Sequence, residues 1–597
     1  MKKQTNYGLW AFIALLCCVL FRFPASAQEA AQPVTNQWSL WFGSHYTGLE
    51  DYTLRVAEFD RGEEGFMPEF QLKWLRTQGQ NRLNFAGNFY DSKRMSLNLQ
   101  GNFSNFLSAK VAYKSFYRRN QIDLLQNMVA RESGNKEGTV AGGKIITNEL
   151  LFDPDTEDIG YRRQEIETHL EAKIPGLKNL KVIASHRSIM ESGHSQEIQI
   201  SHCATCHVTS RSIALDRVTH TVAGGVEAAV TNDFIVSYQA QYRQFKSNEG
   251  TYEAMFDTAR HPVNGSSGDE FASRNIFSGE TAQLGLYPET KKLSHRFKAK
   301  GVFGKTNLLA QVVSFTAENN NDLPDENVLI TGDRETSGTY THLRLAHPFF
   351  PKTKLIAGAY YGTYENSSVL VDLPDWRDNR SGGDIDFDYT RFSNYTRTEM
   401  RGNLEFIYQP TSRYRLSLLG EYSTRERDDY PFEGAKDKTT KFLLQGDVKY
   451  RPSREFTGHL RYYFENIDNP FSPYNNLFER YGRSGPDSLT PIPGTPAVYY
   501  YQRDAIRYGS VTSLPAVVNG GKLDVDYRLT PKTKLSLGLT AKIATNNDTP
   551  ELEYKQTSMQ PTLGFSAVPN DKFSLFTSFS YLYKTQNGIA TFAMMDG

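Results

Sequence analysis

Apolar and polar residues alternate along most of residues 38–597, and this alternation predicts β-strands. In residues 523–529 the apolar side chains occupy every second position, and Asp524, Asp526 and Arg528 lie between them. Side chains two residues apart share a face of a strand, so one face is apolar and the other is charged. After a turn at 530–533 the alternation resumes from Leu535 to Ile543. We therefore predict two strands joined by a tight turn, each long enough to cross a bilayer at a tilt.

The same unit recurs around tight turns at 231–233, 409–412, 451–454 and 569–571. These short turns alternate with long polar stretches at 118–160, 247–292, 366–394 and 467–519. A soluble β-sandwich would have shorter strands with short turns at both ends. Short turns at one end and long loops at the other are typical of transmembrane barrels. We predict an all-β fold, a large antiparallel transmembrane β-barrel of roughly 22 strands with long extracellular loops and short periplasmic turns, in the outer membrane of a Gram-negative bacterium.

A barrel of this size encloses a lumen wide enough to need a plug. Many positions predicted to face inward are charged or polar, and the clearest are Asp447, Lys449, Asp524, Arg528 and Lys542. Water or a protein could fill such a lumen. The last predicted strand, from Phe573 to Tyr583, runs outward, and bacterial barrels have an even number of strands with both termini in the periplasm. We therefore expect at least one further strand after Gly597.

The first 27 residues have the order of a signal peptide. Lys2 and Lys3 precede an apolar run from Leu9 to Phe21, and Ala25-Ser26-Ala27 forms a cleavage site. An uncleaved anchor or a lipoprotein signal is the alternative, but the apolar run is short and Leu16 precedes Cys17. The expected domains are a signal peptide at 1–27 and a barrel at 28–597, with a haem-binding loop at 192–217.

Charge and composition exclude several classes of protein. The 597 residues include 67 Lys and Arg and 67 Asp and Glu. Sequence-independent nucleic-acid binding needs a surplus of positive charge, so we exclude nucleic acid as a partner. A mean hydropathy of −0.54, with no apolar run of helix-spanning length after residue 25, excludes a helical membrane protein. Signal cleavage would leave only two of the four cysteines, which excludes a fold held together by disulfides.

The two remaining cysteines belong to a single motif, Cys203-Ala204-Thr205-Cys206-His207. Cys-x-x-Cys-His is the c-type haem attachment signature, in which two thiols bind the vinyl groups and the adjacent histidine binds the iron. A redox disulfide would need a thioredoxin-like helix start, and a structural zinc site would need four ligands. Chance is the remaining alternative. We predict one covalent haem c held by Cys203, Cys206 and His207.

Five of the 12 histidines lie between residues 186 and 220, namely His186, His194, His202, His207 and His220. This enrichment suggests that one of them is the second axial ligand of the haem iron. His202 is too close to Cys203 to reach the far face easily, and His220 shares parity with Val222 and points toward lipid. We choose His194 as the candidate; Met190 and a histidine from a partner protein remain open.

The chain resembles the MtrB/PioB family of outer-membrane porins, the barrels of porin-cytochrome electron conduits. The resemblance lies in the Thr-Pro-type hairpins, clearest at 523–535, and in the large barrel that begins near Trp38. It implies a sheath around a periplasmic multihaem c-type cytochrome, with an outer-surface cytochrome as a further candidate partner. Barrels of this family do not generally bind haem, and the motif at 203–207 departs from that pattern.

We therefore predict an outer-membrane barrel that carries one haem and transfers electrons across the outer membrane, without enzymatic activity. One haem is much smaller than a hydrocarbon core of about 30 Å, so further haems must come from a partner. The main alternative is a diffusion porin or transporter whose Cys-x-x-Cys-His motif is structural. A haem-dependent sensor or oxidoreductase is a third class. No Ser/His/Asp set, carboxylate pair or phosphate loop supports a hydrolase or nucleotide enzyme.

Overall fold

The computed structural model describes most of the chain after residue 32. The described residues are 33–48, 65–104, 106–120, 122–125, 145–154, 156–157, 159–174, 176–177, 179–201, 205–249, 252–255, 281–284, 287–320, 329–331, 334–367, 369–373, 377–378, 383–384, 387–393, 396–427, 438–470, 476–478, 500–501, 507–508, 511–512, 514–547, 554–570 and 572–587. The predicted signal peptide at 1–27 lies outside them. Within these ranges no helix is long and apolar enough to cross a membrane.

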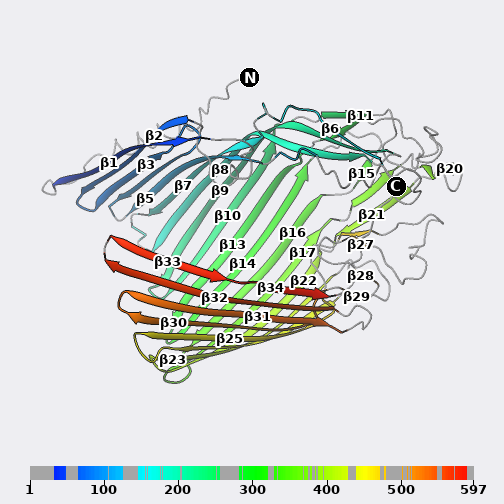
Figure 1. Ribbon diagram of the computed structural model, residues 1–597. Coiled ribbons are helices and arrows are strands. Elements are labelled where there is room, and N and C mark those ends of the chain that lie inside the picture. Colours follow the sequence, from blue (N-terminus) through cyan, green and yellow to red (C-terminus); the bar gives the residue numbers. More distant parts are fainter. Residues whose placement is uncertain are drawn as a thin grey trace.

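One sheet forms the body of the molecule and curves around as a barrel wall does, with β1 at one edge and β33 and β34 at the other (Figure 1). It holds 23 described strands, of which only β6 pairs in parallel with its neighbour, so the prediction of roughly 22 antiparallel strands is confirmed. Its first strands are β1 (Val34–Thr47), β2 (Gly65–Gln78), β3 (Asn81–Phe89), β4 (Met95–Phe103), β5 (Leu107–Arg119), β6 (Ile145–Leu150), β7 (Gly160–Lys173), β8 (Leu180–Ser201), β9 (Thr205–Thr231), β10 (Phe234–Ser247), β13 (Glu289–Phe303) and β14 (Thr306–Asn320).

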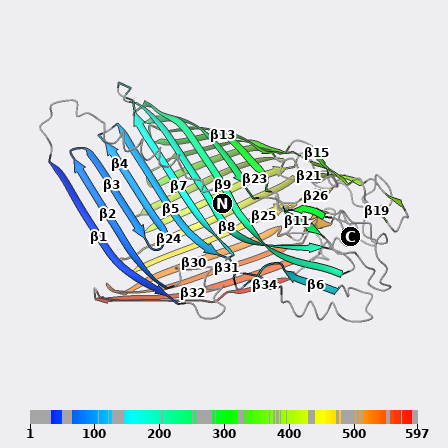
Figure 2. The ribbon, with the colours of Figure 1, turned by 90° about the horizontal axis from the view of Figure 1, so that it is seen from above.

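The strands of the second half continue the same up-and-down order around the wall (Figure 2). They are β16 (Glu335–His347), β17 (Thr353–Asn366), β22 (Arg397–Thr411), β23 (Tyr414–Glu426), β24 (Lys438–Tyr450), β25 (Phe456–Asp468), β30 (Val517–Thr530), β31 (Thr533–Asn546), β32 (Tyr554–Asn570), β33 (Phe573–Ser580) and β34 (Tyr583–Asn587). In the described part of the chain, β33 and β34 pair only with β32, and β1 pairs only with β2.

The predicted hairpins form with the expected register. Leu523 lies opposite Leu539 and Tyr527 opposite Leu535, and the strands reverse at residues 531–532. Thr530 accepts a hydrogen bond from the Lys532 amide through its hydroxyl, which closes the turn locally. In this register the apolar side chains of both strands lie on the same face. A slip by one residue would move those of one strand to the opposite face, so the apolar pattern fixes the register.

The two faces of the sheet differ in chemistry. On one face the large apolar side chains are exposed; examples are Leu404, Leu418, Leu460 and Tyr462, which are 51–58% exposed. The opposite face carries most of the charged side chains. Contact between the charged face and lipid would place charged side chains in hydrocarbon, which costs a large free energy. The apolar face therefore contacts lipid, and the charged face lines the lumen.

The two ends of the sheet also differ. The turn end carries tight turns such as 79–80, 232–233, 304–305, 412–413 and 531–532. The loop end carries the long connections, which contain short strands of their own: β11 (Tyr252–Met255), β12 (Thr281–Leu284), β15 (Leu329–Thr331), β18 (Val369–Leu373), β19 (Arg377–Asp378), β20 (Gly383–Asp384), β21 (Phe387–Ser393), β26 (Asn476–Phe478), β27 (Tyr500–Tyr501), β28 (Arg507–Tyr508) and β29 (Val511–Thr512). Five of these, from three different connections, form one small sheet, β15-β18-β21-β26-β27.

Candidate haem site and lumen wall

Strands β8 and β9 are 22 and 27 residues long and extend beyond the strands beside them. Strand β7 begins at Gly160, opposite His194, and β10 ends at Ser247, opposite Arg217. Past these levels the described residues of the two strands, 195–201 and 205–213, remain paired at the loop end, and we call them the projecting hairpin. The described residues of the expected haem-binding loop at 192–217 continue both strands, and haem binding by this segment stays a prediction. Ile198 and Ile200 alternate with polar residues there, which favours extended backbone.

The described part of the haem motif, residues 205–207, begins strand β9 in the projecting hairpin. Cys203 is outside the described residues, and Cys206 and His207 are described by their backbone alone. His207 lies opposite Ser201 of β8 and opposite Thr147 of β6. The far end of β9, at Thr231, pairs with Phe234 in a tight turn of the turn end. The described residues 195–201 and 205–213 therefore lie at the end with the long loops.

Hydrogen bonds anchor the base of the projecting hairpin. Gln196 accepts a bond from the Asp123 amide at 2.7 Å and donates to the Asp123 carbonyl and the Ser210 hydroxyl, each at 2.7 Å. Ser212 donates to the Glu157 carboxylate at 2.5 Å. The Ile159 side chain is fully buried beside this network, and Ser210 is fully buried as well. These hydrogen bonds join the hairpin to Asp123 and Glu157, and they hold its base against the neighbouring chain.

The structure does not bring the candidate axial ligands together. His194 lies opposite Ala214, and seven residues of β8 separate it from Ser201, the partner of His207. At about 3.3 Å per residue this is roughly 23 Å, too far for both imidazoles to bind one iron. Met190 is four residues farther still. His202 lies outside the described residues. The choice of His194 is thus not supported by this arrangement.

His186 and His220 form a stacked pair, with ring centroids 5.7 Å apart and an angle of 16° between the rings. His186 lies opposite Val222, which is 52% exposed on the lipid-facing side. The prediction that His220 shares the lipid-facing parity of Val222 and Val226 is confirmed by this register. Both histidines lie on the wall and not in the projecting hairpin, so neither is placed near residue 207.

The donors of the motif fit a covalent haem in chemical type. Two thiols supply the thioether sulfurs and one imidazole supplies an iron ligand. A strand turns consecutive residues to opposite faces, so binding one haem through both Cys206 and His207 would require the backbone at the start of β9 to leave the extended conformation. Among the described residues, no group of three His, Cys, Asp or Glu side chains is close enough to hold a metal ion by itself.

The lumen wall carries ion pairs over much of its surface. Asp447 accepts hydrogen bonds from His459 at 2.8 Å and from Arg461 at 3.0 Å. Glu399 lies 2.7 Å from both Arg397 and Arg425. The positions predicted to face inward, Asp447, Lys449, Asp524, Arg528 and Lys542, all have the lumen-facing parity. A charged wall that contains ion pairs suits a lumen filled by water or by a protein.

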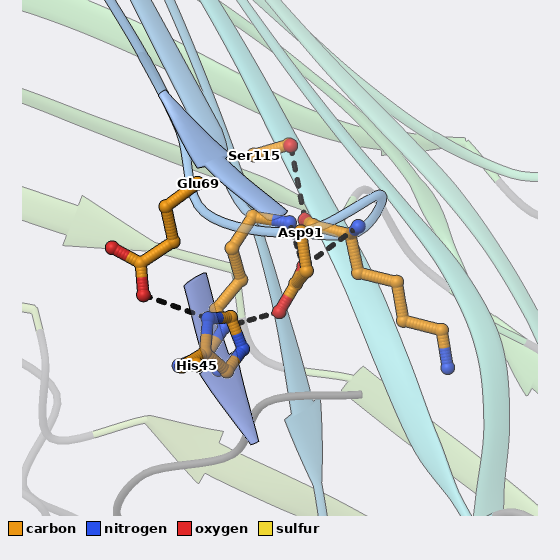
Figure 3. A network of polar contacts seen from close by, with 6 residues as sticks. His45, Glu69, Asp91 and Ser115 are labelled. Atoms are coloured by element: carbon orange, nitrogen blue, oxygen red, sulfur yellow. Dashed lines mark hydrogen bonds and ion pairs between the residues drawn. The ribbon is translucent and has the colours of Figure 1, made fainter. Parts of the chain in front are cut away.

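Sequence reasoning missed a polar cluster at the β3–β4 connection (Figure 3). Asp91 accepts bonds from the amides of Lys93 at 2.9 Å and Arg94 at 2.6 Å, and Arg94 Nε donates to its other oxygen at 2.9 Å. The Ser115 hydroxyl donates to the Lys93 carbonyl. Nearby, His45 Nδ1 is 2.7 Å from Glu69. The Asp-Ser pair at 91–92 is a turn signal that could have indicated this closed loop.

Comparisons with known proteins give no family. The sequence matches no family model and no curated protein. The siderophore receptor PirA from Acinetobacter baumannii is 8% identical with a TM-score of 0.44, covering 84% of this chain and 67% of that one. The ferric enterobactin receptor PfeA from Pseudomonas aeruginosa is 11% identical with a TM-score of 0.43, covering 83% and 72%. The copper transporter OprC is 9% identical with a TM-score of 0.39, covering 92% and 72%. Such low similarity carries no functional argument.

The architecture itself identifies the setting of the chain. An antiparallel up-and-down sheet with an apolar lipid face, a charged lumen face, short turns at one end and long loops at the other is the construction of outer-membrane barrels. The chain is an outer-membrane β-barrel of a Gram-negative bacterium.

Proposed function

We propose that this barrel carries one covalent haem c, bound by Cys203, Cys206 and His207, and takes part in electron transfer across the outer membrane. The observation that carries the proposal is the position of Cys206 and His207, at the start of β9 on the loop end. A bound haem would supply a one-electron carrier. The chain's own part is to hold it by two thiols and one imidazole at the mouth of the lumen that faces the exterior.

The partner in this proposal is a periplasmic multihaem c-type cytochrome that enters the lumen. Support comes from the charged wall, from the size of the barrel, and from the resemblance to MtrB/PioB porins. Since neither His194 nor Met190 lies near residue 207, we propose that a partner protein, such as an outer-surface cytochrome, supplies the second axial ligand.

The test is haem retention by the denatured chain. The full-length protein is expressed with a c-type maturation system, purified, denatured and stained for haem, and the pyridine haemochrome spectrum is recorded. We expect retained haem in the wild type, because thioether bonds survive unfolding. Cys203→Ala combined with Cys206→Ala should abolish it.

His207→Ala gives a second readout, because this change should remove an axial ligand and shift the absorption spectrum. His194→Ala is the matched control and should leave the spectrum unchanged. A wild-type chain that contains no haem under these conditions contradicts the proposal and favours the diffusion porin or transporter, for which the polar lumen is sufficient.

A further inference from the structure

One sector of the lumen wall carries cations without carboxylates. On the five neighbouring strands β10, β13, β14, β16 and β17, the described residues of lumen-facing parity include no Asp or Glu. The same positions include seven cations, which we call the basic arc: Arg243, Lys292, Arg296, Lys298, Lys300, Arg344 and Lys354. The strands lie side by side in the wall (Figure 1).

The sectors on both sides of the arc are built differently. Toward the N-terminus, Lys181 pairs with Glu227 at 3.0 Å and Arg187 with Glu165 at 2.5 Å. Toward the C-terminus, the next strand is β22, where Glu399 pairs with Arg397. Glu405 on the same strand accepts a hydrogen bond from Ser417 at 2.8 Å. Both flanking sectors therefore contain cations with carboxylate partners. In the arc they have none among the described residues.

The arc is also continuous. Along β13 the cations run from Lys292 to Lys300, eight residues or about 26 Å of strand. Lys300 lies opposite Leu309, which in turn lies opposite Arg344, so the two cations are two strands or roughly 10 Å apart. Arg296, Lys298, Lys300, Arg344 and Lys354 are exposed to the lumen. The arc therefore spans much of the height of the wall.

Aromatic residues of the same parity lie among these cations. Lys292 lies over the Phe315 ring at 4.0 Å. Phe315 contacts Tyr364 with centroids 6.4 Å apart, and Tyr340 stacks with Tyr360 at 6.1 Å. Tyrosine and arginine are enriched where proteins contact proteins. A surface of this length, with aromatic side chains among its cations, fits a macromolecular ligand better than a single small anion.

We propose that the basic arc binds an acidic polypeptide surface inside the lumen. The like charges along this wall repel one another, and a bound polypeptide of opposite charge would offset that repulsion. The same attraction would direct the polypeptide into the lumen. The inference deepens the proposed function by assigning the lumen partner an acidic face that meets β10–β17. The inference rests on the proposed function in one respect, namely that the acidic polypeptide is the periplasmic cytochrome.

The test uses labelled poly-L-glutamate as the probe and the full-length chain in detergent micelles. Binding is followed by fluorescence anisotropy at low and high salt. The arc variant is R296Q/K298Q/K300Q. The matched control, K441Q/K522Q/K534Q, removes the same charge from three cations that each have a carboxylate within 3.0 Å.

We expect salt-sensitive binding by the wild type, with the dissociation constant raised at least roughly tenfold in the arc variant and much less in the control. Absence of binding at low salt, or equal loss in both variants, overturns the proposal. If the arc variant does not fold, R344Q/K354Q replaces it. The Cys203→Ala, Cys206→Ala chain is measured in parallel, so a failure of haem attachment and a failure of anion binding are told apart.

Discussion

At the scale of single residues, Asp91 is a buried carboxylate held by backbone and side-chain donors. It is 1% exposed and accepts bonds from two amides and from the Arg94 guanidinium. Arg94 in turn lies over the Tyr90 ring, whose other neighbour is His45, stacked at 4.0 Å. One carboxylate thus shapes the whole connection between β3 and β4.

We predict that Asp91→Ala lowers the free energy of unfolding by about 2 kcal/mol, because it leaves buried donors without an acceptor. Asp526→Ala is the control: Asp526 pairs with Lys534 at 2.9 Å, but its side chain is 43% exposed, so its loss should cost about 0.5 kcal/mol or less. Urea unfolding in lipid micelles, followed by tryptophan fluorescence, measures both. Equal costs would show that the carboxylate of Asp91 is not structural.

At the scale of elements, the projecting hairpin leaves the wall where two glycines meet. Gly193 has φ of +156°, and a Cβ added there would lie 2.1 Å from the Gly160 carbonyl oxygen. Gly160 is the first residue of β7, and the backbones of β7 and β8 approach closely at this level. This contact lies at the level where the hairpin extends past the neighbouring strand.

Gly193→Ala should therefore displace the hairpin and destabilise the barrel by about 2 kcal/mol or more, since backbone must move. Gly224→Ala is the matched control, because a Cβ there meets nothing within 4 Å. Limited proteolysis of the folded protein reports the change: cleavage near residues 202–204 should accelerate in the first variant only. Equal cleavage rates would contradict the role given to Gly193.

At the scale of the whole molecule, the asymmetry of the two ends predicts the orientation in the membrane. Tight turns belong to the periplasmic side of bacterial barrels. An epitope inserted between Ser412 and Arg413 should be detected only after the outer membrane is permeabilised. The same epitope placed between residues 428 and 437 should be detected on intact cells. The reverse pattern would place the haem motif on the periplasmic side.

The sequence by itself determined the strands, the tight turns and the face that meets lipid, because alternation and turn chemistry are local properties. The hairpin at 523–543 and the lumen parity of Asp447 and Lys542 were readable for this reason. Only the tertiary structure decided that β6 pairs in parallel with β9, that the motif stands on a projecting hairpin, and that roughly 23 Å separates His194 from the level of His207. It also placed five strands without lumen carboxylates side by side. These features depend on contacts between residues distant in sequence, and no local pattern encodes which strand extends past its neighbours.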